Sequence, residues 1–208
     1  MLLEKINDFC QSVETEFEQI SAERKEALLP LSNYIYQKIS AKETPKIIVI
    51  CTHNSRRSHM GQLWLATGAA YYGLPKMETY SGGTEATAFN PRAVKACRAA
   101  GFQITTQNAT DANPVYDIMW TSEMRPYQAF SKKYSTEPNP TAKFAAMMVC
   151  TSADEGCPIV SGSDFRIALP FHDPKAFDDT DLEAAKYTER CRDIAREMLY
   201  VLNQVNKN

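Results

Sequence analysis

Hydrophobic residues in the first part of the chain recur with the period of an α-helix. Between residues 1 and 21 they follow one another at spacings of three and four, which predicts an amphipathic helix. The pattern continues over residues 22–40, where Pro30 is expected to break the helix or to begin a new one. We therefore expect a helical N-terminal extension, residues 1–45, that forms an α-hairpin packed on the rest of the protein. The same periodicity would also suit a dimer surface.

From residue 46 onward, short apolar runs alternate with segments of helical periodicity. Strands are predicted at residues 46–50, 76–81, 115–120, 144–150 and 166–170, and helices at residues 57–72, 90–100 and 182–206. Segment 121–143 is polar and interrupted by prolines, so we expect an irregular insertion or a lid there. This alternation is typical of the α/β class, with a parallel sheet, helices on both faces and a functional site at the carboxyl ends of the strands.

Composition narrows the class of protein without choosing a function. The chain has 208 residues, of which 44% are hydrophobic and 23% charged, as expected for one globular core. A net charge of −2 argues against nucleic acid or a membrane surface as partner. The N-terminus lacks the pattern of a signal peptide and no apolar run is long enough to span a membrane, so we expect a cytoplasmic protein. In that compartment the six cysteines are expected to be reduced thiols.

The most specific signal is a cysteine at the end of the first predicted strand. Five residues separate Cys51 from Arg57, and the next helix is expected to begin at Ser58, a favoured N-cap residue. The backbone N–H groups of such a loop and the helix dipole bind an oxyanion, the arginine can grip two of its oxygens, and the same field favours the cysteine thiolate. The expected oxyanion-binding residues are Thr52, His53, Asn54, Ser55, Arg56, Arg57 and Ser58. The sequence thus predicts a nucleophile inside an anion site.

Three further residues are expected at the same edge of the sheet. Cys150 ends the strand predicted at 144–150 and Cys157 follows it, and the two can approach each other if the polar loop between them curls. Their spacing does not suit a zinc knuckle and we expect no metal site, which leaves two unrelated thiols as the alternative. Asp173 precedes a proline and is a candidate general acid, although Asp-Pro is also a common turn.

Together these motifs resemble the low-molecular-weight phosphotyrosine phosphatase superfamily, and more closely its thioredoxin-coupled arsenate reductase branch. The residues that carry the resemblance are Cys51–Ser58, Ser81–Glu85 with Asn90-Pro91, the Cys150/Cys157 pair and Asp173-Pro174. It extends from about residue 46 to the C-terminal helix, without segment 121–143. The resemblance implies a four-stranded parallel sheet flanked by helices, and it makes residues 46–208 the catalytic domain.

The resemblance implies a reductase reaction that uses three cysteines. Cys51 attacks arsenate held by the loop and Arg57, while Asp173 protonates the departing hydroxyl. Cys150 then attacks Cys51 and releases arsenite, and Cys157 attacks Cys150, which leaves a disulfide for thioredoxin to reduce. No cofactor is implied beyond such an external thiol reductant. A phosphatase acting on phosphate esters would need Cys51, Arg57 and Asp173 only, so the other two cysteines favour the reductase. A third interpretation of the sequence is a non-enzymatic protein that senses oxyanions or redox state.

Four residues depart from the family pattern. His53 stands where the loop commonly has glycine, and Arg56 replaces the second loop cysteine of the phosphatases. Gln62 stands where potassium-binding reductases carry an acid, so we expect no cation there. His172 stands where some phosphatases have an aromatic wall of the substrate pocket. His53 and His59 are interpreted as polar surface groups rather than metal ligands.

Overall fold

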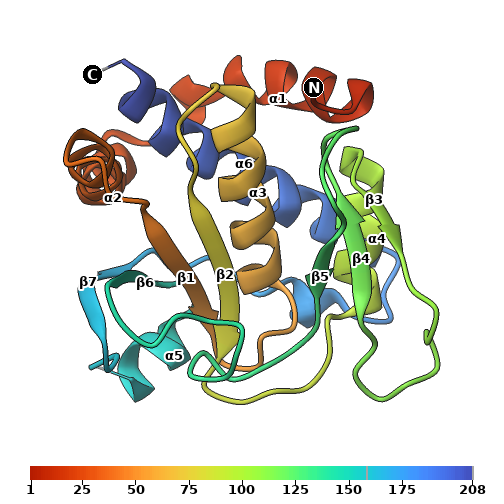
Figure 1. The fold of residues 1–208 in the computed structure, drawn as a ribbon. Coiled ribbons are helices and arrows are strands. Elements are labelled where there is room, and N and C mark those ends of the chain that lie inside the picture. The colour runs from red at the N-terminus through yellow and green to blue at the C-terminus, as the bar shows by residue number, and fades with distance from the viewer. Residues whose placement is uncertain (158, 208) are drawn as a thin grey trace.

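The central sheet of the computed structural model, which describes residues 1–157 and 159–207, has four parallel strands. They are β1 (Lys46–Cys51), β2 (Glu78–Gly83), β6 (Phe144–Met148) and β7 (Ser163–Ala168), in the order β2-β1-β6-β7. The two central strands are buried along almost their whole length, as their near-continuous apolar runs require. Because the strands are parallel, their carboxyl ends meet at one edge of the sheet, the lower edge in Figure 1. The expected four-stranded parallel sheet is confirmed.

In the described part of the chain, four α-helices follow the first strand. They are α3 (Arg57–Tyr71), α4 (Pro91–Ala100), α5 (Thr151–Gly156) and α6 (Glu183–Asn206). α3 packs against β1 and β2 and against α6, and at Gly68 an added Cβ would lie only 2.6 Å from the side chain of Leu202. α4 begins as expected after Asn90, whose side chain accepts a hydrogen bond from the Arg92 N–H (2.9 Å). Within the described ranges, no helix has the length and apolar character needed to cross a membrane.

The N-terminal helices are α1 (Glu4–Glu14) and α2 (Ala22–Ser40), connected through the 3₁₀ turn η1 (Phe17–Gln19). Both pack against α6, and α2 also contacts β7 (Figure 1). The prediction that Pro30 breaks or begins a helix is wrong, because α2 runs through it. Pro30 lies on the exposed face of α2, where water can hydrate the carbonyl that proline leaves unbonded. The buried face of α2 keeps the helix continuous through that position.

A second sheet lies apart from the first and is antiparallel. It consists of β3 (Gln103–Thr105), β4 (Tyr116–Met119) and β5 (Tyr127–Ala129), in that order. The strand predicted at 115–120 is β4, but its assignment to the parallel sheet is wrong. Its residues alternate between buried and half-buried, which is typical of an antiparallel strand with one covered face. Segment 121–143 is therefore only partly irregular, since it contains β5.

Candidate active site

Cys51 is the last residue of β1, and its side chain is buried at the start of the loop that leads into α3. The Cys51 Sγ lies 3.1 Å from the Ser58 hydroxyl, which also accepts a hydrogen bond from the Asn54 amide (2.9 Å). Asn54 adopts a left-handed backbone conformation (φ 44°), and its side-chain oxygen accepts a hydrogen bond from the backbone N–H of Lys132 (2.8 Å). The buried side chains of Asn54 and Ser58 thus fix the conformation of the loop.

Ser58 is not the N-cap of α3, which corrects the expectation from sequence. The N-cap is Arg56, and Ser58 is the second residue of the helix. The hydroxyl of Ser58 contacts Cys51 and Asn54 instead of an N-terminal backbone N–H group. The Ser58 hydroxyl therefore bonds to Cys51 and does not cap the helix.

The end of β2 supports the loop through its backbone. The Thr84 N–H donates to the Cys51 carbonyl (3.1 Å), and the Glu85 N–H donates to the Thr52 carbonyl (2.8 Å). Further along, the Asn90 N–H donates to the Ser55 carbonyl (2.9 Å). The second sequence motif, Ser81–Glu85 with Asn90, therefore holds the carbonyl groups of the loop.

Replacing Gly83 by alanine is expected to destabilise the protein by about 2–3 kcal/mol, because the position has no room for a side chain. An added Cβ would lie 2.7 Å from both the Asn54 backbone nitrogen and the Thr52 carbonyl oxygen. Urea unfolding of Gly83→Ala should show this loss. The matched control is Gly156→Ala, where nothing lies within 4 Å of an added Cβ. Equal stability of the two variants would contradict this account.

Arg57 reaches across the edge of the sheet to the segment that follows β7. Its guanidinium donates to the Phe171 carbonyl (2.7 Å) and to the Asp173 carboxylate (2.5 Å). The other carboxylate oxygen of Asp173 accepts a hydrogen bond from the Lys175 N–H (3.0 Å), so the carboxylate is held in one orientation. The small pocket at this point is lined by Cys51, Thr52, His53, Ser55, Arg56, Arg57 and Asp173. The candidate nucleophile Cys51, the arginine and the candidate acid are thus brought together.

Cys150 lies beside the same loop, whereas Cys157 lies one helix away. Cys150 is buried at the N-terminal end of α5, with its Sγ 3.4 Å from the Thr52 hydroxyl. Cys157 follows α5, is partly exposed, and donates to the Ile159 carbonyl (3.4 Å). Arg166 donates to the Cys157 carbonyl (3.1 Å) and to the Asp154 carboxylate (2.5 Å), which fixes the end of α5.

Three predicted oxyanion-binding residues have their side chains elsewhere. Asn54 and Ser58 are fully buried beneath the loop, outside the pocket lining. Arg56 touches the pocket, but its guanidinium nitrogens donate to the hydroxyl of Tyr187 (2.7 Å) and to the carboxylate of Asp178 (3.3 Å). Sequence reasoning missed both of these partners, since neither lies in a motif.

His53 and His59 differ in burial. His53 is half-exposed beside Glu85 (3.5 Å), in agreement with a surface group. His59 is fully buried, which corrects the expectation, and its ring stacks on Phe89 at 4.0 Å between centroids. Its two nitrogens lie 3.0 Å from the Asn54 carbonyl and 3.2 Å from the Ser81 hydroxyl. Within residues 1–157 and 159–207, no three His, Cys, Asp or Glu side chains gather as metal ligands would.

Acidification from pH 7 to pH 5 is expected to cost about 2 kcal/mol of folding stability through His59. Burial, and then the nearby charge of Lys132, lower the pKa of His59 to about 3. The folded pKa is below the unfolded value, so this contribution is complete above about pH 6.5 and is lost as the pH falls toward 3. Urea unfolding at pH 5–7 should show a shallower pH dependence for His59→Gln than for the parent. The exposed His172, changed to glutamine, is the control, and an unchanged slope for His59→Gln would contradict this explanation.

Part of this chain is similar in sequence to known proteins. A sequence model of the low molecular weight phosphotyrosine protein phosphatase family matches residues 46–117. A protein of Staphylococcus epidermidis named arsenate reductase 2 is 31% identical over 130 residues, which cover 62% of this chain and 77% of that protein. A protein of Bacillus licheniformis named arsenate reductase is 29% identical over 147 residues, which cover 71% of this chain and 86% of that protein.

Solved structures share the fold at low sequence identity. The YwlE mutant from Bacillus subtilis superposes with a TM-score of 0.52 and 15% identity, over 77% of this chain and 98% of that one. A low molecular weight phosphotyrosine phosphatase from Vibrio cholerae O395 gives a TM-score of 0.50 and 12% identity, over 76% of this chain and 95% of that one. The loop after β1, the parallel sheet and these relatives lead to one conclusion: the chain belongs to the low molecular weight phosphotyrosine protein phosphatase family.

Proposed function

We propose that this protein is an arsenate reductase in which Cys51, Cys150 and Cys157 pass a disulfide in that order. The observation that carries the proposal is the position of Cys150, a buried thiol 3.4 Å from the Thr52 hydroxyl and next to the loop of the nucleophile. Hydrolysis of a phosphate ester does not require a second thiol at that point. The relatives named arsenate reductase support the same choice.

In the first step, the Cys51 thiolate attacks the arsenic atom of arsenate. The loop N–H groups and the Arg57 guanidinium hold the remaining oxygens, where negative charge increases in the transition state. A hydroxyl leaves arsenic and takes a proton from the Asp173 carboxylic acid, so that it departs as water. Asp173 is positioned for this by its hydrogen bonds to Arg57 and to the Lys175 N–H.

In the second step, the Cys150 thiolate attacks the Cys51 sulfur. An S–S bond forms, the S–As bond breaks, and its electron pair reduces As(V) to As(III), which leaves as arsenite. The Cys157 thiolate then attacks Cys150, which frees the Cys51 thiolate and leaves a 150–157 disulfide. An external dithiol such as thioredoxin supplies the two electrons that restore Cys150 and Cys157. This chemistry needs reduced thiols, so we propose that the protein works in the cytoplasm.

The attack of Cys157 on Cys150 requires α5 to unwind. Cys150 and Cys157 stand at the two ends of a six-residue helix, which is about 9 Å long. A disulfide needs Cα atoms about 4.4–6.8 Å apart, so the intact helix keeps the two thiols from bonding. The whole helix, about one and a half turns, must open. Arg166 must also release the Cys157 carbonyl.

A phosphatase acting on phosphate monoesters is the second candidate function. The Arg57–Asp173 pair beside Cys51 favours it, because nucleophile, anion-binding arginine and general acid suffice for ester hydrolysis. In that reading water resolves a Cys51 thiophosphate, and Cys150 and Cys157 only protect the nucleophile from oxidation.

Mass spectrometry of the thiols after one arsenate turnover without reductant separates the two candidates. The reductase should show a 150–157 disulfide together with one equivalent of arsenite. Three free thiols and no arsenite, with hydrolysis of nitrophenyl phosphate that survives serine at both 150 and 157, would contradict the reductase and favour the phosphatase.

A further inference from the structure

Two consecutive arginines at the start of α3 hold the two ends of one segment, residues 173–178. Arg57 binds Asp173 at the first end (2.5 Å). Arg56 binds Asp178 at the second end (3.3 Å). Between them lies the short 3₁₀ helix η2 (Pro174–Phe177). The loop of the nucleophile and the segment of the candidate acid are therefore joined at two points.

The second point of attachment is a closed triangle of hydrogen bonds, which we call the clasp: Arg56, Asp178 and Tyr187. The Arg56 Nε donates to the Tyr187 hydroxyl (2.7 Å), and this hydroxyl donates to the Asp178 carboxylate (2.7 Å). Tyr187 comes from α6 and is 1% exposed, and the side chains of Arg56 and Asp178 are 12% and 19% exposed. Burial, and then Asp178, raise the pKa of Tyr187 to about 12, so the phenol keeps its proton. Charge-assisted bonds among such covered groups are stronger than surface ion pairs.

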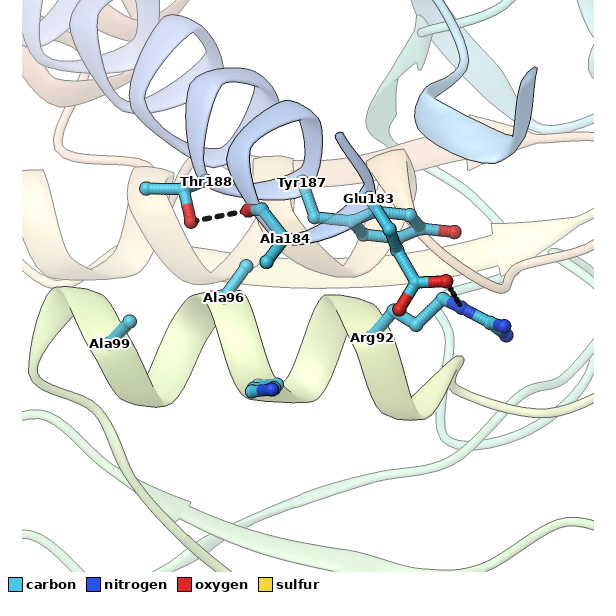
Figure 2. A pocket seen from close by; sticks show the side chains of 8 residues that line it. Arg92, Ala96, Ala99, Glu183, Ala184, Tyr187 and Thr188 are labelled. Carbon is cyan, nitrogen blue, oxygen red and sulfur yellow. Dashed lines mark hydrogen bonds and ion pairs between the residues drawn. The ribbon is translucent and has the colours of Figure 1, made fainter. Parts of the chain in front are cut away.

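A further arginine on α4 extends the clasp. Arg92 donates to the Glu183 carboxylate (2.5 Å) and to the Asp179 carboxylate (2.6 Å). Figure 2 shows Arg92 on α4 and Glu183 and Tyr187 on α6 beside one another at the cavity between these helices. Asp179 has a left-handed backbone (φ 62°), and its N–H also donates to Glu183 (2.8 Å). The chain just after residue 178 is therefore fixed as well.

The segment between Asp178 and Asp173 is short and internally bonded, so we expect a displacement of Asp178 to reach Asp173. The Asp178 N–H donates to the Lys175 carbonyl (3.0 Å), and the Lys175 N–H donates to the Asp173 carboxylate (3.0 Å). Pro174 removes one backbone degree of freedom inside the segment. A release of the second end would leave the Asp173 carboxylate held by the Lys175 N–H of a loosened segment and by Arg57, the same guanidinium that must bind the oxyanion.

We infer that Arg56, Asp178 and Tyr187 are positioning residues, which hold the Asp173 carboxyl over the Cys51 pocket. This inference rests on the proposed function, in which Asp173 is the general acid. It assigns Arg56 a role different from that of an oxyanion ligand, because its guanidinium is engaged by Tyr187 and Asp178. Arg56, one of the four residues at which this chain departs from the family pattern, thus acts on the acid rather than on the anion.

The kinetic test compares aryl phosphates with good and poor leaving groups, because only a poor leaving group needs the acid. Tyr187→Phe, Asp178→Asn and Arg56→Gln should each lower kcat for phenyl phosphate about tenfold, a part of what a positioned acid contributes, and change kcat for dinitrophenyl phosphate less than twofold. KM and inhibition by inorganic phosphate should stay unchanged. The matched control is Arg98→Gln, an arginine of α4 bonded to the Ile104 carbonyl (2.7 Å), which should behave as the parent. Arg56→Lys should recover part of the loss.

The result that overturns the inference is weaker phosphate inhibition in Arg56→Gln with equal loss for both esters, since that is the behaviour of an oxyanion ligand. Hydrogen exchange separates this failure from failure of the proposed function. The amides of residues 175–178 should exchange at least tenfold faster in Tyr187→Phe than in the parent or in Arg98→Gln, whether or not any substrate is turned over. Unchanged exchange would disprove the clasp. A parent that does not reduce arsenate with thioredoxin, together with faster exchange in the variant, would disprove the proposed function alone.

Discussion

Arsenate-dependent oxidation of reduced thioredoxin is expected to disappear in Cys51→Ser, Cys150→Ser and Cys157→Ser, because each variant stops the relay before the 150–157 disulfide forms. Serine at 51 is a poor nucleophile, because its hydroxyl stays protonated where a thiol ionises. The Cys150→Ser variant leaves arsenic bound to Cys51. The Cys157→Ser variant leaves a 51–150 disulfide that cannot be transferred to residue 157. Cys51→Ser and Cys150→Ser should therefore release no arsenite, and Cys157→Ser should release one equivalent.

The control for this series is a cysteine that the relay does not use. Cys10 of α1 is fully buried, and burial, followed by Glu14, raises its pKa to about 12. Such a thiol is neither ionised nor accessible, so Cys10→Ala should turn over at the rate of the parent and lose only stability. Continuous turnover with thioredoxin by Cys157→Ser, at the parent rate, would rule out the order of the relay.

The second large effect concerns Asp173. Asp173→Asn is expected to lower kcat with arsenate by about 10²–10³, because an amide cannot deliver the proton that the departing hydroxyl needs. The amide oxygen can still accept one of the two hydrogen bonds, from Arg57 or from the Lys175 N–H, but the amide nitrogen cannot accept the other, so a loss of stability is expected beside the loss of kcat. Steady-state kinetics measure the loss of kcat, and urea unfolding measures any loss of folding stability.

Asp181→Asn is the matched control for that variant, because Asp181 is exposed, lies close in the chain, and does not line the pocket. We expect its kcat to equal that of the parent. An Asp173→Asn protein with kcat within a few-fold of the parent would show that water, and not Asp173, supplies the proton. The clasp would then have no acid to position.

The parts of the site that sequence predicts are local in the chain. Cys51 and Arg57 are fixed by one strand, one loop and one helix start, and these elements form where their periodicity places them. Asn90 with Pro91 begins α4 for equally local reasons. Local rules failed at Ser58, because its hydroxyl bonds to Cys51 rather than to the helix end.

The remaining features depend on residues far apart in the chain. The direction of the Arg56 side chain is set by Tyr187, 131 positions later, and no pattern near residue 56 contains that information. The burial of His59 depends on the ring of Phe89, and the antiparallel pairing of β4 depends on β3 and β5. Periodicity shows that a strand exists, but it does not show which sheet the strand joins.

The N-terminal helices have a consequence for the evolution of this protein. Arg24 of α2 donates to the Pro170 carbonyl (3.3 Å), and its guanidinium lies 5.1 Å from the ring centroid of Phe171, whose carbonyl is bonded to Arg57. α2 thereby supports the backbone that leads to Asp173. Natural selection acting on the reaction rate therefore also acts on residues of α2 that no substrate touches, and drift in this helix is constrained by chemistry as well as by packing.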